Sequence, residues 1–228
     1  MPSLILVRHG QSQWNLENRF TGWWDVDLTE KGVAEAKAAG RLMAEKGVLP
    51  TRAFTSFQTR AIKTLHLALD EARRLWIPEV KDWRLNERHY GGLTGLDKQE
   101  TRDKHGDEQV HVWRRSFDIP PPPIDTGSQY DPGADPRYDG IAVPTSESLK
   151  DTIERVLPYY RSAIVPVLES GETVIISAHG NSLRALVKHL SGISDDDITG
   201  LEIPTGQPIV YPIENGAPSG ERTYLSDT

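Results

Sequence analysis

Cysteine is absent from this sequence of 228 residues. Its absence excludes disulfides, a catalytic thiolate and any zinc site built on cysteine. No apolar run approaches the roughly 20 residues that a membrane-spanning helix needs. Residues 1–7 carry no basic segment, so we expect them to form a strand rather than a signal peptide. These absences fit a cytoplasmic protein.

Charge and composition limit the function further. The net charge of -7 argues against a general nucleic-acid surface, but it leaves room for a local cationic pocket that binds a small anion. The histidines show no H-E-x-x-H or similar zinc spacing, so no metal site is expected. Hydrophobic residues make up 37% of the chain and charged residues 26%, which is typical of a globular protein with a substantial core.

Strands and helices are predicted to alternate along the chain. Thr29 is a predicted N-cap, Gly47 a predicted C-cap, and Ser148 with Asp151 has the spacing of a capping box. The predicted strands are 4–7, 52–55, 79–83, 173–177 and 208–213. The first predicted helix begins after Thr29, and the others span 61–74, 98–116 with a break near Gly106, 148–168 with a bend at Pro158, and 182–190. This order predicts an α/β fold of three layers, α/β/α, with a mostly parallel central sheet.

Two segments do not fit regular structure. Residues 119–145 contain an unbroken proline run at 120–123, and proline has a fixed φ and no amide hydrogen. A loop of this length in a compact domain is usually functional or disordered. Residues 214–228 are rich in Gly and Ser, and we expect a flexible tail there. Both segments are candidates to cover a site.

Two distant stretches, residues 6–10 and 177–181, share one design. In each, an apolar run ends at a histidine that is followed by a glycine. Two strands that end in this way can place His9 and His179 at one edge of a parallel sheet, where α/β proteins usually bind ligands. One imidazole can then attack a phosphorus centre while the other stabilises the developing charge. Taken alone, residues 6–10 are also compatible with a turn after a strand, and His179 with a cap of the following helix.

The surroundings of the two histidines favour phosphoryl transfer. Arg8 and Asn15 lie in the same segment as His9, and Gly10 permits close approach of a ligand. Gly180 and Asn181 follow His179 at a predicted helix N-terminus, where free amides and a partial positive charge suit phosphate.

Further cations and one acid are found elsewhere in the chain. Arg60 opposes the dipole at the start of its helix, which favours a bound anion there, with a solvated surface arginine as the alternative. Glu87 can move a proton to or from a substrate hydroxyl. Arg114 and Arg115 form a guanidinium pair suited to an oxyanion, although a solvated helix end is the plain alternative for them.

Taken together, these motifs resemble those of the cofactor-dependent phosphoglycerate mutases, the 2,3-bisphosphoglycerate-requiring branch of the histidine phosphatase superfamily. The resemblance covers nearly the whole length, which would make residues 1–228 a single phosphoglycerate mutase domain. It is carried by residues 8–15, 19–23, 55–56, 87–91, 95–98, 113–117 and 179–181. Departures are few: Gln11 stands where many members have Glu, and Trp24 where Tyr is familiar. Gln11 removes one negative charge near the expected pocket.

The resemblance implies a role for each matching residue. His9 would carry the phosphoryl group, Glu87 would be the acid/base, His179 would stabilise the transition state, and Arg8 and Arg60 would assist them. The implied substrate-binding residues are Arg8, His9, Gly10, Gln11, Ser12, Gln13, Trp14, Asn15, Thr21, Gly22, Arg60, Glu87, Arg88, His89, Tyr90, Lys98, Arg114, Arg115, Gly180 and Asn181.

The implied reaction is the interconversion of 3-phosphoglycerate and 2-phosphoglycerate in glycolysis and gluconeogenesis, through a phosphohistidine that 2,3-bisphosphoglycerate primes. The resemblance also allows a minor bisphosphoglycerate phosphatase or synthase activity. It implies a cytoplasmic, metal-independent isomerase that forms a homodimer or homotetramer and has no nucleic-acid or membrane partner.

Three rival functions fit parts of this sequence. A general phosphomonoester phosphatase of the same fold would not need the cationic residues between positions 88 and 115. A non-catalytic phospholigand-binding module could lose either histidine, and this chain has both. A metal-dependent mutase would need a cluster of carboxylate and histidine ligands, and no such cluster is evident in the sequence.

Overall fold

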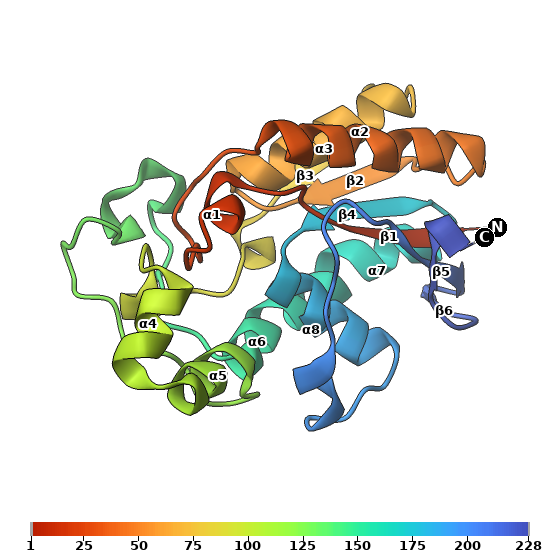
Figure 1. Ribbon diagram of the computed structural model, residues 1–228. Helices are drawn as coiled ribbons and strands as arrows, with labels where there is room; N and C mark the ends of the chain where they lie inside the picture. Colours follow the sequence, from red (N-terminus) through yellow and green to blue (C-terminus); the bar gives the residue numbers. More distant parts are fainter. Residues whose placement is uncertain (1, 228) are drawn as a thin grey trace.

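A computed structural model describes residues 2–227 (Figure 1). The strands are β1 (Ser3–Arg8), β2 (Arg52–Thr55), β3 (Glu79–Lys81), β4 (Val174–Ala178), β5 (Ile209–Glu214), β6 (Ala217–Pro218) and β7 (Thr223–Tyr224). The α-helices are α1 (Gln13–Leu16), α2 (Glu30–Glu45), α3 (Thr59–Glu71), α4 (Lys98–His105), α5 (Asp107–Arg115), α6 (Leu149–Tyr159), α7 (Val165–Glu169) and α8 (Gly180–Leu190).

One sheet connects the strands in the order β3-β2-β4-β1-β5-β6, and β7 also pairs with β5. Strands β1 to β4 run parallel to one another, and β5 runs antiparallel to β1. Strand β4 therefore lies between β2 and β1, in the middle of the parallel part of the sheet. Parallel neighbours bring their carboxyl ends to the same edge of the sheet, which is where both His-Gly turns begin.

Helices cover both faces of this sheet (Figure 1). Alternate residues of a strand point to opposite faces, and β1 illustrates the consequence. Leu4 and Leu6 pack with the side chains of α6, α7 and α8, whereas Ile5 and Val7 pack with those of α2 and α3. The predicted three-layer fold is confirmed, and the apolar runs of the central strands are continuous because both faces are buried.

Local signals set several helix ends. The Thr29 side chain accepts a hydrogen bond from the Gly32 amide at the start of α2. Ser148 and Asp151 form the predicted capping box of α6. Gly106, with φ of 84°, separates α4 from α5 at the predicted break. Gly47, with φ of 67°, follows the end of α2 one residue beyond its C-cap.

The predicted helix over 148–168 is divided into three parts. Helix α6 passes through Pro158, a π-helical turn follows at Tyr160–Ile164, and α7 completes the segment. Proline supplies no amide hydrogen to the preceding turn, and π-helical turns widen the helix locally. Helix α8 begins at Gly180, two residues earlier than predicted, so His179 directly precedes it.

The C-terminal segment differs from the expectation. Strand 208–213 was predicted to be the last, but β6 and β7 follow it and both pair with β5. Leu225 is buried among the residues that β1 and α2 contribute to one core cluster. The segment thus extends the sheet, because its apolar side chains have a hydrophobic face to cover. None of residues 214–227 lines the pocket described below.

The proline-rich segment contains two short 3₁₀ turns, Pro132–Ala134 and Pro136–Tyr138, and no α-helix or strand among residues 119–145. Tyr138 is buried, and its hydroxyl accepts a hydrogen bond from the Asn86 side-chain amide. Among residues 2–227, no helix combines the length and apolar character needed to cross a membrane.

Candidate active site

Strand register brings the two histidines together. Arg8 of β1 pairs with Ala178 of β4, so His9 and His179 are the first residues beyond a matched pair. The His9 amide donates to the Ala178 carbonyl over 3.0 Å. As a result the two imidazole rings lie with their centroids 5.1 Å apart. The predicted juxtaposition of the two His-Gly turns is confirmed.

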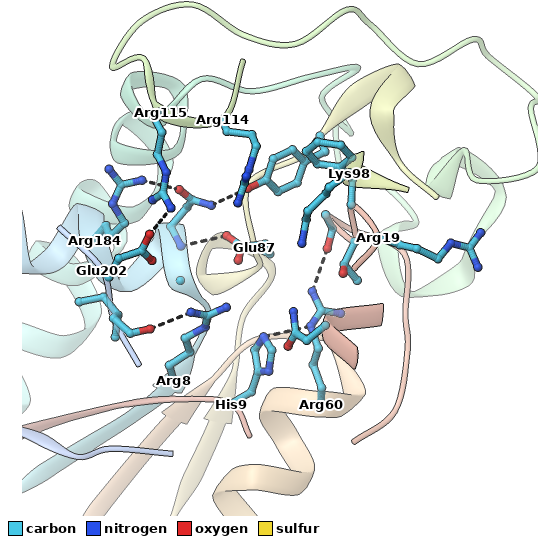
Figure 2. Close-up of a pocket in the computed structure, with 18 residues that line it drawn as sticks. Arg8, His9, Arg19, Arg60, Glu87, Lys98, Arg114, Arg115, Arg184 and Glu202 are labelled. Carbon is cyan, nitrogen blue, oxygen red and sulfur yellow. Dashed lines mark hydrogen bonds and ion pairs between the residues drawn. The ribbon is translucent and has the colours of Figure 1, made fainter. Parts of the chain in front are cut away.

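His9 is held as a neutral imidazole with a defined tautomer. Its Nδ1 lies 2.7 Å from the Gly10 carbonyl oxygen, which can only accept a hydrogen bond, so Nδ1 carries the proton. The lone pair is then on Nε2, which faces the Arg60 Nε at 3.3 Å (Figure 2). Burial holds the pKa of His9 well below its usual value, and the charges of Arg60 and Arg8 lower it further. Nε2 is therefore unprotonated at neutral pH, and its lone pair accepts a hydrogen bond from Arg60.

His179 is also buried, and one of its nitrogens is engaged. Its Nε2 lies 2.8 Å from the Ser56 hydroxyl, which follows directly after β2. Its Nδ1 is buried with no partner among the described residues. Burial lowers its pKa well below the usual value, and the nearby Arg60 and His9 add to this effect. A buried polar nitrogen without a partner is costly, and in the tautomer that carries the proton on Nδ1 an anion beside His9 would satisfy it.

Two arginines supply positive charge beside His9. Arg60, the second residue of α3, donates to the carbonyls of Trp24 (3.1 Å) and Gly22 (2.9 Å). Burial lowers the pKa of Arg60 to about 10, so it remains charged near neutral pH. Arg8 donates to the Ile203 carbonyl over 2.7 Å, and its Nε is buried with no partner within residues 2–227. Both guanidinium groups are oriented before any ligand binds.

Glu87 is the acid of this inner region. Its Oε1 accepts from the Arg88 amide (2.8 Å) and from the Asn181 amide (3.0 Å). Its own amide donates to the Gln58 Oε1 over 2.8 Å. These bonds hold the carboxylate at the N-terminus of α8, with the other oxygen available to a substrate hydroxyl.

The pocket as a whole is strongly cationic. Among the described residues, its lining includes seven cations and two acids: Arg8, Arg19, Arg60, Lys98, Arg114, Arg115 and Arg184 against Glu87 and Glu202. Figure 2 shows His9 and Arg60 at one end of the pocket and Arg114 and Arg115 at the other. In a chain of net charge -7, this concentration of cations indicates a multiply charged anionic ligand.

Neighbouring cations also change the properties of the polar groups in the outer part of the pocket. Burial alone would raise the pKa of Tyr90, but the charges of Arg88 and Lys98 outweigh it and bring that pKa to about 8. Burial lowers the pKa of Lys98, and Arg114 and Arg8 lower it further. The outer pocket therefore stabilises added negative charge.

Most predicted site residues line the pocket. These are Arg8, His9, Asn15, Thr21, Gly22, Arg60, Glu87, Tyr90, Lys98, Arg114, Arg115, Gly180 and Asn181. Gly10, Gln11, Ser12, Gln13, Trp14, Arg88, His89 and His179 are not among the lining residues, and of these only His179 packs its ring against His9.

The segment after His9 turns toward α2 instead of the pocket. A Cβ at Gly10 would lie 2.2 Å from the Gly32 carbonyl oxygen, so glycine serves close packing there. The Gln11 side chain accepts from the Thr29 hydroxyl at the start of α2. Ser12 caps α1 and positions Asn15, while Trp14 stacks on Trp24. These residues support the pocket wall from behind.

Arg88 and His89 also lie behind the wall. Arg88 donates to the carbonyls of Trp113 and Arg114, and its guanidinium lies 4.5 Å from the Tyr90 ring centroid. The His89 Nδ1 accepts from the Gly91 amide, and burial lowers its pKa to about 4. Arg88 and His89 lie between Glu87 and Tyr90 in the chain. Of these four residues, only Glu87 and Tyr90 face the pocket.

Five lining residues had no assigned role in the sequence analysis: Arg19, Phe20, Arg184, Glu202 and Ile203. A signal existed for Arg184, because it is the one cation in the apolar run 183–187 of α8 and is only 4% exposed. Glu202 comes from the loop before β5 and pairs with Arg115 across the pocket. Nothing local in the sequence distinguishes Glu202 from other surface acids.

Within residues 2–227, no group of three or more His, Asp or Glu side chains is arranged to hold a metal ion. The chemistry available to the site is that of a neutral imidazole nucleophile, a carboxylate and a set of cations. This set is suited to transfer of a phosphoryl group, in which positioning and charge stabilisation supply most of the catalysis.

Comparison with known proteins agrees with this site. The sequence profile of the histidine phosphatase superfamily (branch 1) matches residues 4–224. A 2,3-bisphosphoglycerate-dependent phosphoglycerate mutase of Erythrobacter litoralis is 83% identical over 228 residues, with all of both chains covered. A mutase of the same name from Zymomonas mobilis is 61% identical over 227 residues, again with all of both chains covered.

The fold has solved relatives as well. The structure of Bacillus stearothermophilus YhfR superposes with a TM-score of 0.72 at 27% identity, covering 95% of this chain and 94% of the other. The chain therefore belongs to the histidine phosphatase superfamily and, within it, to the family of 2,3-bisphosphoglycerate-dependent phosphoglycerate mutases.

Proposed function

We infer that this chain, as one domain, interconverts 3-phosphoglycerate and 2-phosphoglycerate in glycolysis and gluconeogenesis. The observation that carries the inference is the neutral His9, whose unprotonated Nε2 accepts from Arg60 in a pocket lined by seven cations. The full-length relatives bear the name of this activity. Both substrates are small, highly charged anions, and they match the charge of the pocket.

His9 acts as the carrier of the phosphoryl group. Its Nε2 attacks phosphorus, the bond between phosphorus and the donor oxygen breaks, and Glu87 supplies the proton that the departing alkoxide takes up. In the reverse direction Glu87 removes the proton from the accepting hydroxyl. Arg8, Arg60 and His179 stabilise the charge on the equatorial oxygens, and Asn15, Gly180 and Asn181 complete this inner part of the pocket.

The outer cations bind the remainder of the substrate. Tyr90, Lys98, Arg114 and Arg115 would hold the carboxylate and the phosphate that is not being transferred, with Thr21 and Gly22 beside them. Guanidinium groups suit both anions, because each planar fork can donate hydrogen bonds to two oxygens at once. This leaves the three-carbon acid free to turn between the two transfers.

The residues also fit 2,3-bisphosphoglycerate as the priming cofactor. The unpartnered buried nitrogens of Arg8 and His179 could hold one phosphate at His9, and Arg114 and Arg115 could hold the other at the opposite end. When bound, this cofactor would supply the first phosphoryl group. A minor phosphatase or synthase activity toward the bisphosphate would follow from transfer to water or from early release.

A mutase must keep water from the phosphorylated histidine. Strands β6 and β7 pair with β5, and none of residues 214–227 lines the pocket, so the C-terminal segment does not cover it as expected from the sequence. The proline-rich segment is the better candidate. Its Tyr130 hydroxyl accepts from Arg19, which lines the pocket, over 3.0 Å, and its ring contacts both Trp14 and Trp24.

One assay tests the proposal. Conversion of 3-phosphoglycerate to 2-phosphoglycerate is followed in EDTA, with and without added 2,3-bisphosphoglycerate, and phosphorylation of His9 is measured in parallel. We expect EDTA-resistant conversion that the bisphosphate stimulates. Release of inorganic phosphate without isomerisation would instead support the phosphatase, and loss of activity in EDTA would support a metal-dependent enzyme.

We also infer that the enzyme is a cytoplasmic homo-oligomer. An open edge of the sheet supports self-association: among the described residues, β3 pairs only with β2. Leu75, Trp76 and Val80 are 54%, 71% and 42% exposed beside that edge. An open strand edge with exposed apolar side chains is a typical site of self-association. Analytical ultracentrifugation of wild-type protein and of Trp76→Glu tests it, and a monomeric wild type would contradict it.

A further inference from the structure

The segment that carries Glu87 lacks regular secondary structure of its own. It follows a 3₁₀ turn at Trp83–Leu85 and precedes another at Gly91–Leu93, so helix or sheet bonds do not hold its carbonyl groups. The carbonyls of Arg84, Asn86 and Glu87 nevertheless have partners. All three accept hydrogen bonds from one side chain, that of Arg155 on α6.

Arg155 contacts the backbone on both sides of Glu87. Its Nη1 donates to the Arg84 carbonyl (2.8 Å) and to the Asn86 carbonyl (3.1 Å), and its Nη2 donates to the Glu87 carbonyl (2.9 Å). A single planar group therefore fixes the relative positions of three peptide units. A rotation of the Glu87 backbone would break at least one of these bonds.

Glu147 completes the arrangement from the other side. Its Oε1 and Oε2 accept from the Nε and Nη2 of Arg155 over 2.6 and 2.8 Å. Its Oε2 also accepts from the His89 amide over 2.8 Å, and its own amide donates to the His89 carbonyl over 2.9 Å. The ion pair thus holds the residues on either side of the Glu87–Arg88 peptide.

The burial of this pair argues against a simple stabilising role. The Arg155 and Glu147 side chains are 8% and 4% exposed. Removing two charges from water costs about as much as their attraction returns, so a buried ion pair is weak support for stability alone. What the pair supplies is a defined geometry at Glu87, whose own carboxylate is oriented by the Asn181 amide.

We propose that Arg155, held by Glu147, is a positioning residue for proton transfer by Glu87. Neither residue lines the pocket, so both act through the backbone of Glu87. This proposal rests on the proposed function, because it concerns the acid/base step of that reaction. The step that depends on Arg155 is then proton transfer at the substrate hydroxyl, and the bonding of the phosphoryl group to His9 does not depend on it.

This distinction can be measured. When phospho-His9 reacts with an alcohol, the N–P bond breaks, an O–P bond forms and the hydroxyl proton goes to Glu87. When His9 is phosphorylated by p-nitrophenyl phosphate, the N–P bond forms and p-nitrophenolate leaves as an anion that needs no proton. The first reaction needs a well-placed Glu87, and the second needs only His9 and the cations.

The test compares Arg155→Lys, Arg155→Met and Glu147→Gln with wild type in both reactions. We expect kcat for 3-phosphoglycerate to fall about 10- to 100-fold, with Lys less impaired than Met, because small misplacements of a catalytic group have effects of this size. The burst of p-nitrophenolate should stay within about threefold of wild type. The control Arg84→Met removes a nearby guanidinium that pairs with Asp82 and has no contact with Glu87.

Equal losses in both reactions would overturn the positioning role and show a general structural one. An unchanged kcat for the mutase reaction would overturn it as well. If Arg155→Met does not fold, Arg155→Lys and Glu147→Gln decide the question, since each keeps a polar group of similar size. A wild-type enzyme that gives the burst but no mutase activity would count against the proposed function and not against the Glu87 geometry.

Discussion

The two ends of the pocket are built differently. At the floor, defined here as His9, His179 and Arg60, each side chain is at most 2% exposed and is bonded to a backbone carbonyl or to a buried hydroxyl. At the rim, defined as Arg114, Arg115 and Glu202, the groups are more open: the side chains of Arg115 and Glu202 are 23% and 64% exposed and pair with each other.

The difference matches the chemistry of each end. Groups that stabilise a transition state must be oriented in advance, because reorganisation during the reaction adds to the barrier. Groups that only hold a substrate can move. Here they must move, since the three-carbon acid reorients in the pocket between the two phosphoryl transfers. The floor is thus predicted to control kcat and the rim to control KM.

The largest effect is expected at the floor, from His9→Ala. Removing the nucleophile should lower kcat roughly 10⁴-fold or more and abolish the acid-labile phosphoprotein. The control His66→Ala removes an exposed histidine that pairs with Glu79 and should leave kcat unchanged. Substantial mutase activity in His9→Ala would show that the phosphoryl group does not pass through this residue.

A matched pair of substitutions tests the comparison directly. Arg60→Lys keeps the charge at the floor but loses the two carbonyl contacts of the guanidinium, and kcat should fall about 10²- to 10³-fold. Arg115→Lys at the rim should raise KM by less than about tenfold and leave kcat within about twofold. Steady-state kinetics on both variants provide the measurement. Similar kcat losses at the two positions would remove the distinction between floor and rim.

Acid should destabilise the floor. Burial lowers the pKa of His9 and His179 well below 6.5 and that of His89 to about 4. Between those values and 6.5 the unfolded chain binds more protons, so stability is retained above pH 6.5 and lost as pH falls below it. Each histidine contributes roughly 1.4 kcal/mol per pH unit in this window.

Urea unfolding between pH 7.5 and 5 measures this dependence. His9→Asn should reduce the slope of the free energy of unfolding against pH, whereas His111→Gln, on the exposed side of α5, should not. A free energy of unfolding that stays constant between pH 7.5 and 5 would contradict the neutral, buried state of the floor histidines.

The smallest effect is expected from Glu202→Gln at the rim. The Glu202 carboxylate forms an ion pair with Arg115, so an anionic substrate that binds Arg115 must displace this carboxylate. Removing this competing charge should lower KM for 3-phosphoglycerate about two- to fivefold at low salt, with kcat unchanged, because exposed pairs are weak and screened. Asp195→Asn is the control, since Asp195 is similarly exposed and pairs with Lys188 away from the pocket. A higher KM in Glu202→Gln would show that Glu202 assists binding.

Much of the floor could be predicted from sequence, for a physical reason. A residue that directly follows a buried parallel strand has its position set by the strand, and His9 and His179 both do. Local capping signals at Thr29 and Ser148 likewise depend on neighbours within three residues. The C-terminal segment shows the limit: its Gly and Ser content suggested a tail, yet Leu225 is buried because the sheet offers an apolar face there.

The sequence by itself determined the alternation of strands and helices, the sites of the two histidines and the abundance of cations, since these depend on local pattern and residue type. Only the tertiary structure decided which groups meet. Arg60 reaches His9 from α3, Glu202 reaches Arg115 across the pocket, and Arg155 holds the backbone of Glu87 from α6. Such contacts join residues separated by 51, 87 and 68 positions, and they exist only because packing of the layers brings those elements together.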